Sequence, residues 1–529
     1  MAALTSELSP PLVRRSAEGQ LSELIRARSS ALGAQSYIEH ARGDRGLSFT
    51  DLEGALAGWA DTLEESGVAP GSTVGLAIAD PIDFSIAFLG TIASGRWAAP
   101  LDPSTPAPGL DAALARVQAH IVFSDRPTGP TAFTTPGGLG VEWVDGERTS
   151  PPEWSADEAS GGAVLASSGT TGAPKVIPLH QGRLLHTARR VADHHRLTPS
   201  DRGFNSLPLF HINAEVVGLL ASLVAGSCLV LDDRFHRTRF WALMAERRIT
   251  WINAVPAIIS RLATPDLGEV VPSRIRFIRS ASAPLPVATS ARFETNTGIP
   301  VVETYGMTEA ASQITANPVT GVRKPGSVGL PVGVEVRVVG GEPAQAEMQP
   351  APGGPIGEIE IRGPSVIAAY AGHHHAERID AQGWLRTGDL GHFDEDGYLY
   401  LDSRIDDVIN RGGEKVFPRE IEELILADPD VGAVAVVGSP DHELGQVPVA
   451  FIVLRGFEDD ADADADIDIG LAALVTARLR DHLGAALVRS KRPVSLSVVR
   501  ALPAGATGKV RRRALRDTDI PAVYHLDCR

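Results

Sequence analysis

The segment at residues 166–175 carries the residue types best suited to phosphate chemistry. It reads ASSGTTGAPK and follows the apolar run GAVL. Its glycines let the backbone approach a ligand, while its hydroxyls and Lys175 offer donors and a positive charge to phosphate oxygens. Its spacing differs from GxxxxGK[ST], because only two residues separate the glycines and no hydroxyl follows the lysine. The segment predicts a phosphate-binding loop, although alone such a stretch is more often a plain flexible loop.

Further segments of the same kind follow at wide separations. They are SASAPL at 280–285, ETYGMTEA at 303–310, WLRTGDLG at 384–391, SRIDDVINRGGEKVFPREIE at 403–422 and LPAGATGKVRR at 502–512. Each segment is weak evidence alone, but their joint occurrence in this order is specific. Through them the chain resembles, over nearly its whole length, the adenylate-forming superfamily of acyl-CoA synthetases, luciferases and peptide-synthetase adenylation domains.

This resemblance implies an ATP site. Tyr305 would stack on adenine, Asp389 would accept hydrogen bonds from the ribose hydroxyls, and Arg404 would reach the ribose or the phosphates. The residues that the resemblance assigns to ATP are Ser167, Ser168, Gly169, Thr170, Thr171, Gly172, Ser282, Ala283, Pro284, Glu303, Thr304, Tyr305, Gly306, Met307, Asp389 and Arg404. Each of the three main residues has an ordinary alternative, since Tyr305 could be a core aromatic, Asp389 a turn cap and Arg404 a surface cation.

The resemblance also implies how the reaction is catalysed. A carboxylate that attacks the α-phosphate of ATP is an anion meeting an anion, so the site must position and neutralise both. Glu309 would hold Mg²⁺ through hard oxygen ligands, with Thr308 close to the α-phosphate, and Lys175 and Lys509 would supply positive charge. Pyrophosphate leaves, and the acyl-adenylate then yields to coenzyme A with release of AMP. On their own, Glu309 would be a solvated carboxylate and Lys509 an exposed lysine of the basic tail.

A mobile C-terminal domain is the third implication. The expected units are an N-terminal adenylation domain at 1–402, a hinge at 403–407 centred on Asp406, and a mobile domain at 408–529. A few residues at an element boundary can absorb such a rotation. Lys509 would enter the site for adenylation. Rotation would then replace it with Gly412, Gly413 and Glu414, whose glycines leave room for a pantetheine arm.

The acid should bind beside the segment PLFHINAEVVG at 208–218. The expected pocket residues are His211, Ile212, Asn213, Ala214, Arg279, Ser280 and Ala281. His211 matches a gating position of the family, and a purely structural histidine is an equal alternative. The chain is most similar to the oxalate-CoA ligase branch, but that branch tends to have HVHG where this chain has HINA followed by Glu215. An additional carboxylate would repel a dianion, which argues against oxalate itself.

Three functions are compatible with these residues. They are a CoA ligase for a small or aromatic acid, an enzyme that passes the acyl group to an amine or other nitrogen nucleophile, and a non-catalytic ATP- or acyl-AMP-binding protein. Intact Lys509, Glu309 and Asp389 argue against the third function, and the Gly412-Gly413 pair favours the first.

Composition and periodicity predict the architecture that must position these residues. Short apolar runs alternate with amphipathic stretches, as in residues 73–102, which is typical of βαβ units. We expect an α/β protein whose large N-terminal domain has two βα-layered subdomains and a β-rich subdomain beginning near Gly326, followed by a small mobile α+β domain. The three histidines at 373–375 fit a polar loop better than a metal site.

The net charge and the apolar runs limit which kinds of binding partner and which cellular location are expected. A formal charge of −16 argues against a nucleic-acid partner. Two cysteines make no disulfide framework, and neither a signal peptide nor an apolar run of about 20 residues occurs. We therefore expect a cytoplasmic monomer or homodimer without a membrane span.

Overall fold

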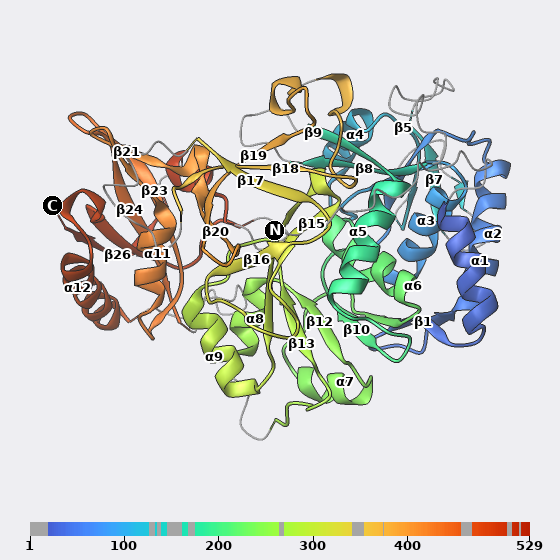
Figure 1. The fold of residues 1–529 in the computed structure, drawn as a ribbon, viewed down its shortest axis with the longest axis horizontal. Coiled ribbons are helices and arrows are strands. Elements are labelled where there is room, and N and C mark those ends of the chain that lie inside the picture. The colour runs from blue at the N-terminus through green and yellow to red at the C-terminus, as the bar shows by residue number, and fades with distance from the viewer. Residues whose placement is uncertain are drawn as a thin grey trace, which may run out of the picture.

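The computed structural model describes residues 20–125, 133–134, 139–144, 161–167, 175–263, 269–340, 354–373, 375–455, 468–504, 510–517 and 520–528. Its strands form three sheets (Figure 1). The seven-stranded sheet has the order β6 (Phe133–Thr134), β7 (Gly140–Trp143), β5 (Ala119–Ser124), β3 (Thr73–Ala77), β4 (Trp97–Pro100), β8 (Gly162–Ser167), β9 (Lys175–His180).

The thirteen-stranded sheet crosses the middle of the molecule. Its order is β17 (Glu335–Val339), β18 (Gly357–Arg362), β19 (Leu385–Phe393), β20 (Leu399–Arg404), β16 (Ser327–Pro331), β15 (Ser312–Ala316), β14 (Val301–Met307), β13 (Phe277–Ser280), β12 (Trp251–Ala254), β10 (Arg202–Asn205), β11 (Cys228–Leu231), β1 (Ser36–His40), β2 (Gly46–Ser48). The helices of this N-terminal part are α1 (Gln20–Leu32), α2 (Phe49–Glu65), α3 (Pro81–Ala93), α4 (Ala107–Arg116), α5 (Gln181–His194), α6 (Ala221–Ala225), α7 (Phe240–Glu246), α8 (Pro256–Leu262) and α9 (Val287–Thr297).

Local sequence explains the first βαβ unit. The parallel strands β3 and β4 flank α3, as expected for residues 73–102. Asp80 caps α3 by accepting hydrogen bonds from two backbone amides of the first turn, and Pro81 follows at the first helical position. The helix stops before Gly95, which has a φ of +75°.

Strand β14 joins the parallel and antiparallel parts of the large sheet. Its first half pairs in parallel with β13, up to Glu303, and its second half pairs antiparallel with β15, from Thr304 onward. The β-rich part is therefore a continuation of the parallel sheet, and the change of direction comes earlier than the expected Gly326. A register shift falls between Tyr305 and Gly306. Irregular pairing of this kind re-aims side chains next to functional sites.

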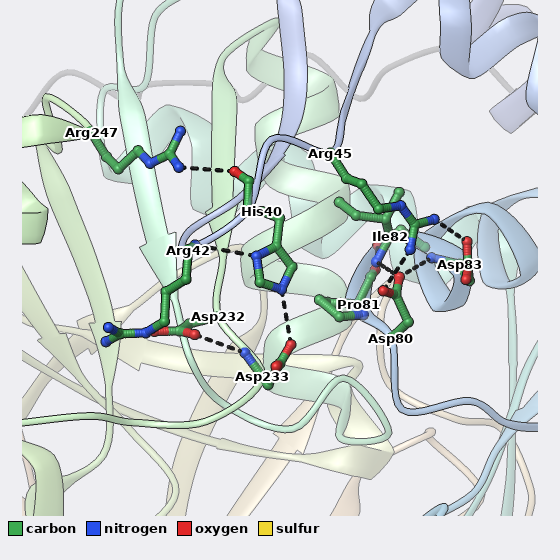
Figure 2. A network of polar contacts seen from close by, with 12 residues as sticks. His40, Arg42, Arg45, Asp80, Pro81, Ile82, Asp83, Asp232, Asp233 and Arg247 are labelled. Carbon is green, nitrogen blue, oxygen red and sulfur yellow. Dashed lines mark hydrogen bonds and ion pairs between the residues drawn. The ribbon is translucent and has the colours of Figure 1, made fainter. Parts of the chain in front are cut away.

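A polar network fastens the β1–β2 loop to the seven-stranded sheet. Arg45 of that loop donates to Asp80 at 2.6 Å and to Asp83 at 2.5 Å, at the start of α3 (Figure 2). At the base of the same loop, His40 contacts Asp233 at 3.1 Å. Because the Arg45 side chain is 54% exposed, such ion pairs contribute at most about 1 kcal/mol each. They orient the loop, while a shared hydrophobic core holds the two sheets together.

The C-terminal part forms its own sheet and core. The sheet has the order β22 (Glu414–Val416), β21 (Ile409–Arg411), β24 (Gly445–Leu454), β25 (Ser495–Val499), β26 (Ala522–Asp527), with β23 (Val431–Asp441) also paired to β24. Its helices α11 (Pro418–Leu426), α12 (Ile469–Ala486) and α13 (Arg512–Asp517) pack on this sheet, which lies to the left of the N-terminal part in Figure 1. No helix within the described ranges is both long and apolar enough to cross a membrane.

Among the described residues, hydrogen bonds cross the boundary between the two parts. Arg419 of α11 donates to the backbone oxygen of Leu401 at 2.7 Å and, more weakly, to that of Gly326 at 3.4 Å. Glu423 accepts a hydrogen bond from the amide of Val287 at 3.3 Å. Such contacts break without exposing an apolar core, so they permit movement of one part relative to the other.

Candidate active site

A cavity of about 680 Å³ lies where β14, the β19–β20 hairpin and the C-terminal part meet. This volume is within the usual range for a small-molecule site, roughly 300–1,000 Å³. The lining residues that the sequence had singled out are Lys175, Ser282, Ala283, Pro284, Thr304, Tyr305, Gly306, Met307, Thr308, Glu309, Asp389, Arg404 and Asp406. Segments up to about 230 positions apart in the sequence therefore meet around one space.

Tyr305 and Asp389 contact each other on one wall of the cavity. The Tyr305 hydroxyl donates to Oδ2 of Asp389 at 2.6 Å. Asp389 is also the cross-strand neighbour of Arg404, whose Nη1 lies 3.5 Å from Oδ1. Burial and the adjacent Asp389 raise the pKa of Tyr305 well above its usual range, so the hydroxyl stays a donor. The aspartate is thus held in one orientation by its contacts with Tyr305 and Arg404.

We expect Tyr305→Phe to raise the KM for ATP on the order of 10-fold, the effect of losing one hydrogen bond to a charged group. The ring remains and can still stack on a base, so kcat should change little. Tyr398→Phe is the matched control, because Tyr398 donates to the backbone oxygen of Val322 instead. It should lower thermal stability and leave the KM unchanged. Equal KM values for Tyr305→Phe and the wild type would contradict the role given to this hydroxyl.

A carboxylate, a phenol and an ammonium meet on the opposite wall. Glu309 lies in the 3₁₀ turn Thr308–Ala310 and is 5% exposed. Its Oε1 accepts a hydrogen bond from the Tyr370 hydroxyl at 2.9 Å, and Nζ of Lys175 lies 5.2 Å from the centre of the Tyr370 ring. Burial, followed by the charge of Arg378, lowers the pKa of Lys175. A buried carboxylate with acceptor capacity left over fits a hard divalent cation such as Mg²⁺.

Several charged lining residues were missed by the sequence reasoning. They are His375, Glu377, Arg378, Arg386, Arg419, Glu422 and Arg512. Arg512 donates to Glu422 at 2.9 Å, and both come from the C-terminal part. Arg386, Arg419 and Glu422 lie inside the segments 384–391 and 403–422 and could have been considered there, whereas Arg378 lies outside every motif. Arginines and carboxylates both line the cavity, and Arg386 is paired with Glu358 as Arg512 is with Glu422.

Glu303 and Thr304 hold the turn at residues 282–284, which lines the cavity together with Thr304 itself. Oε1 of Glu303 accepts a hydrogen bond from the Leu285 amide at 3.4 Å, and Oγ1 of Thr304 donates to the backbone oxygen of Ser280 at 2.9 Å. Ser282 has a φ of +74°, which is costly for a residue other than glycine and must be held in place by its surroundings. Glu303 itself does not line the cavity. It anchors the turn that does.

Burial raises the pKa of Glu303 to about 7 from an ordinary value near 4.5. The folded chain therefore keeps this proton while the unfolded chain loses it, so the contribution of Glu303 to stability falls as the pH rises from 4.5 to 7, by about 3 kcal/mol. We expect Glu303→Gln, which stays neutral and can still accept from Leu285, to gain stability relative to the wild type at pH 8 but not at pH 4.5. Urea midpoints at the two pH values measure this difference. A gain independent of pH would contradict the shift.

The residues expected to bind the acid do not line the cavity. His211, Ile212, Asn213, Ala214, Arg279, Ser280 and Ala281 lie in the protein interior next to it, and all except His211 are at least nine-tenths buried. Glu215, in the π-helix Ala214–Leu220, is fully buried, and burial raises its pKa well above the usual range. Burial therefore favours the neutral form of this carboxyl group, which weakens the expected repulsion of a dianionic acid.

The remaining expected residues lie elsewhere. Ser168, Gly169, Thr170, Thr171, Gly172 and Lys509 are outside the described residues, and Ser167 ends β8. Gly412 and Gly413, with φ values of +60° and +93°, make the turn between β21 and Glu414 of β22. This turn does not line the cavity. Asp406 does line it, within the 3₁₀ turn Ile405–Asp407 that links the two parts of the chain.

Several known proteins are similar to this chain over most of its length. A sulfoacetate–CoA ligase from Cupriavidus necator is 36% identical over 94% of this chain and 97% of its own length. An oxalate–CoA ligase from Arabidopsis thaliana is 33% identical over 85% of this chain and 89% of its own. The solved structure of O-succinylbenzoate coenzyme A synthetase from Bacillus subtilis, in complex with ATP and a magnesium ion, superimposes with a TM-score of 0.74 at 26% identity, covering 93% of this chain and 99% of that one.

The family models match both parts of the chain. The model described as AMP-binding enzyme matches residues 27–371, and the model of the AMP-binding enzyme C-terminal domain matches residues 420–509. These matches confirm the expected resemblance and the expected α/β fold. Because the first model alone covers more than half of the sequence, the chain belongs to the AMP-binding enzyme family.

Proposed function

We propose that this chain is an AMP-forming acid–thiol ligase that activates a small carboxylic acid with ATP and transfers the acyl group to coenzyme A. The observation that carries the proposal is the cavity lined by Tyr305, Glu309, Asp389 and Arg404, whose volume of about 680 Å³ suits a nucleotide and whose lining brings the motif residues together. The similar proteins named above are CoA ligases for small acids. They favour coenzyme A over a nitrogen nucleophile as the acceptor.

The reaction has two steps. In the first, an oxygen of the acid's carboxylate attacks the α-phosphorus of ATP, the bond between the α- and β-phosphates breaks, and pyrophosphate leaves. In the second, the thiol of coenzyme A loses its proton and attacks the acyl carbon, and the bond to AMP breaks. Both steps join electron-rich groups, so positioning and charge neutralisation supply most of the catalysis.

Named side chains divide this work. Tyr305 and Asp389 hold the adenosine, while Lys175, Arg404 and Lys509 neutralise the phosphates. Glu309 would hold Mg²⁺, which when bound offsets the charge of the phosphate oxygens. The buried Tyr370 hydroxyl keeps the Glu309 carboxylate oriented. His211 would act as the gate of the acid pocket.

Domain rotation about Asp406 would separate the two steps. Polar contacts between the parts support a movable interface. In the second step Gly412, Gly413 and Glu414 would come to the cavity. The two glycines have no side chains and would leave a passage for the pantetheine arm. The boundaries at residues 402 and 408 are part of this proposal. The use of ATP and a reduced thiol, together with two free cysteines, favours a cytoplasmic location.

A pyrophosphate-release assay over a panel of small carboxylic acids tests the proposal. Each acid is supplied with ATP and Mg²⁺, with coenzyme A or with an amine, and products are identified by mass spectrometry. We expect acid-dependent release of pyrophosphate, and formation of a thioester and AMP only when coenzyme A is present. Pyrophosphate release without any product that depends on coenzyme A would overturn the acceptor, and no release with any acid would overturn the function.

A further inference from the structure

A buried arginine without an acidic partner lies next to the nucleotide cavity. Arg279, the third residue of β13, is 2% exposed. Its guanidinium donates to three neutral amide oxygens, at 2.8 Å from Asn213, 3.2 Å from Asn253 and 3.3 Å from Gln313. Within the part of the chain that the structure describes, Arg279 forms no ion pair. We call these four residues the Arg279 network.

The chain leaves this positive charge uncompensated. Burying an unpaired charge costs several kcal/mol unless an opposite charge accompanies it. Burial lowers the pKa of Arg279 to about 9, which still leaves the group protonated at neutral pH. Glu215 follows Asn213 by two residues, yet both of its carboxyl oxygens are buried without a hydrogen-bond partner in the described residues. Among the described residues nothing supplies an anion to Arg279, so an anionic ligand would complete its pairing.

Unpaired nitrogen atoms around Arg279 suit the same kind of ligand. Nε of Arg279, Nδ2 of Asn213 and Nε2 of Gln313 are buried, and none has a hydrogen-bond partner among the residues described. Nε2 of His211, two residues before Asn213, is in the same state. Native structures satisfy nearly all such groups. A set dominated by donors calls for a group with several acceptor oxygens, such as a carboxylate or a sulfonate.

The Arg279 network begins one strand away from the nucleotide cavity. Gly306 lines the cavity and pairs with Gln313 across β14 and β15. Neighbouring strands lie about 4.8 Å apart. A Cβ atom at Gly306 would come within 1.6 Å of the Ser312 carbonyl oxygen, so only glycine permits this close pairing. Gln313, and with it the Arg279 network, therefore lies on the strand next to the one that lines the cavity.

We propose that the Arg279 network binds a second anionic group of the acid substrate, so that the chain selects short acids with a carboxylate or sulfonate a few atoms from the reacting carboxylate. This inference rests on the proposed acyl-adenylate function and adds the substrate class. The reacting carboxylate meets the cations of the cavity, and the second anion meets Arg279. Asn213 and Gln313 each use an oxygen to hold the guanidinium and keep a nitrogen for the ligand.

Matched pairs of acids test the inference on the wild-type protein. Each pair replaces the second anion with a neutral group of similar shape: oxalate with oxamate, malonate with malonamate, and sulfoacetate with methylsulfonylacetate. We expect kcat/KM for at least one dianion to exceed that of its neutral partner about 10- to 100-fold, the usual effect of a charged hydrogen-bonding group. The pairs also tell whether a carboxylate or a sulfonate is preferred. Turnover of only monoanionic acids would overturn the inference and leave the proposed function standing, whereas no turnover of any acid would count against the function.

Substitutions distinguish substrate binding from a purely structural role. Arg279→Met should lower kcat/KM for the preferred dianion about 10- to 100-fold and leave its neutral partner and the KM for ATP nearly unchanged. A structural role would instead reduce turnover of both acids alike. Arg279→Lys keeps the charge without the planar fork, should retain part of the preference, and carries the comparison if the Met variant does not fold. Arg276→Met, which removes an ion pair with Asp201 outside the network, is the matched control and should not alter the preference.

Discussion

Lys509→Ala is expected to slow acyl-adenylate formation on the order of 10²–10³-fold, the usual effect of removing one group that stabilises developing charge in a water-excluded site. The reason is electrostatic, because this ammonium would lie between the substrate carboxylate and the α-phosphate during attack. Formation of the thioester from supplied acyl-AMP should change no more than about twofold, as for a surface substitution. Single-turnover measurements of the two half-reactions provide this comparison.

Arg513→Ala is the matched control for Lys509→Ala. Arg513 belongs to the same basic segment, and its side chain is 71% exposed in an ion pair with Asp517. It should leave both half-reactions unaltered. Equal losses in the two half-reactions of Lys509→Ala would refute the rotation model. Equal effects of Lys509→Ala and Arg513→Ala would show that Lys509 has no catalytic role beyond that of an exposed residue in a basic tail.

Glu309→Gln should lower the rate of pyrophosphate release on the order of 10²–10³-fold. The amide still accepts the hydrogen bond from Tyr370, so the local structure should survive, but its neutral oxygen is a poor ligand for Mg²⁺. The concentration of Mg²⁺ for half-maximal activity should therefore rise steeply. The thioester step from acyl-AMP releases no pyrophosphate and should be nearly unaffected. Magnesium titrations of each half-reaction measure both effects.

Glu377→Gln tests whether any carboxylate of the cavity would behave in this way. Glu377 also lines the cavity, but its side chain is 73% exposed. We expect a much smaller loss and an unchanged Mg²⁺ requirement for this variant. If Glu309→Gln kept the wild-type Mg²⁺ dependence, the metal would have to be held by other groups.

Local sequence was sufficient for the elements that carry the site. The strand, helix and strand at residues 73–102 form as expected, because β-branched runs, Asp80 with Pro81 and Gly95 each act within a few residues of one another. The motifs around Tyr305, Glu309 and Asp389 were recognisable because residue type and spacing alone mark them. Three lining residues of the cavity, Tyr305, Glu309 and Asp389, could thus be named before any tertiary contact was known.

Burial and long-range partners could not be assigned in this way. The β-rich part was expected to start near Gly326, yet β14 changes partner at Thr304, a change set by which strand lies on each side. Glu215 is expected to be charged from the sequence, and only the tertiary structure shows its complete burial, which raises its pKa. Tyr370 had no motif to mark it, although it orients Glu309 from 61 residues away.

The sequence by itself determined the family and the motifs whose residues line one cavity, because its segments resemble those of the family in residue type and order. Tertiary structure alone decided the state of each charge and the surroundings of Arg279, whose partners Asn213 and Gln313 lie 66 and 34 positions away. The physical reason is that solvation and hydrogen bonding are set by what packs around a group, and packing joins residues that are distant in the chain.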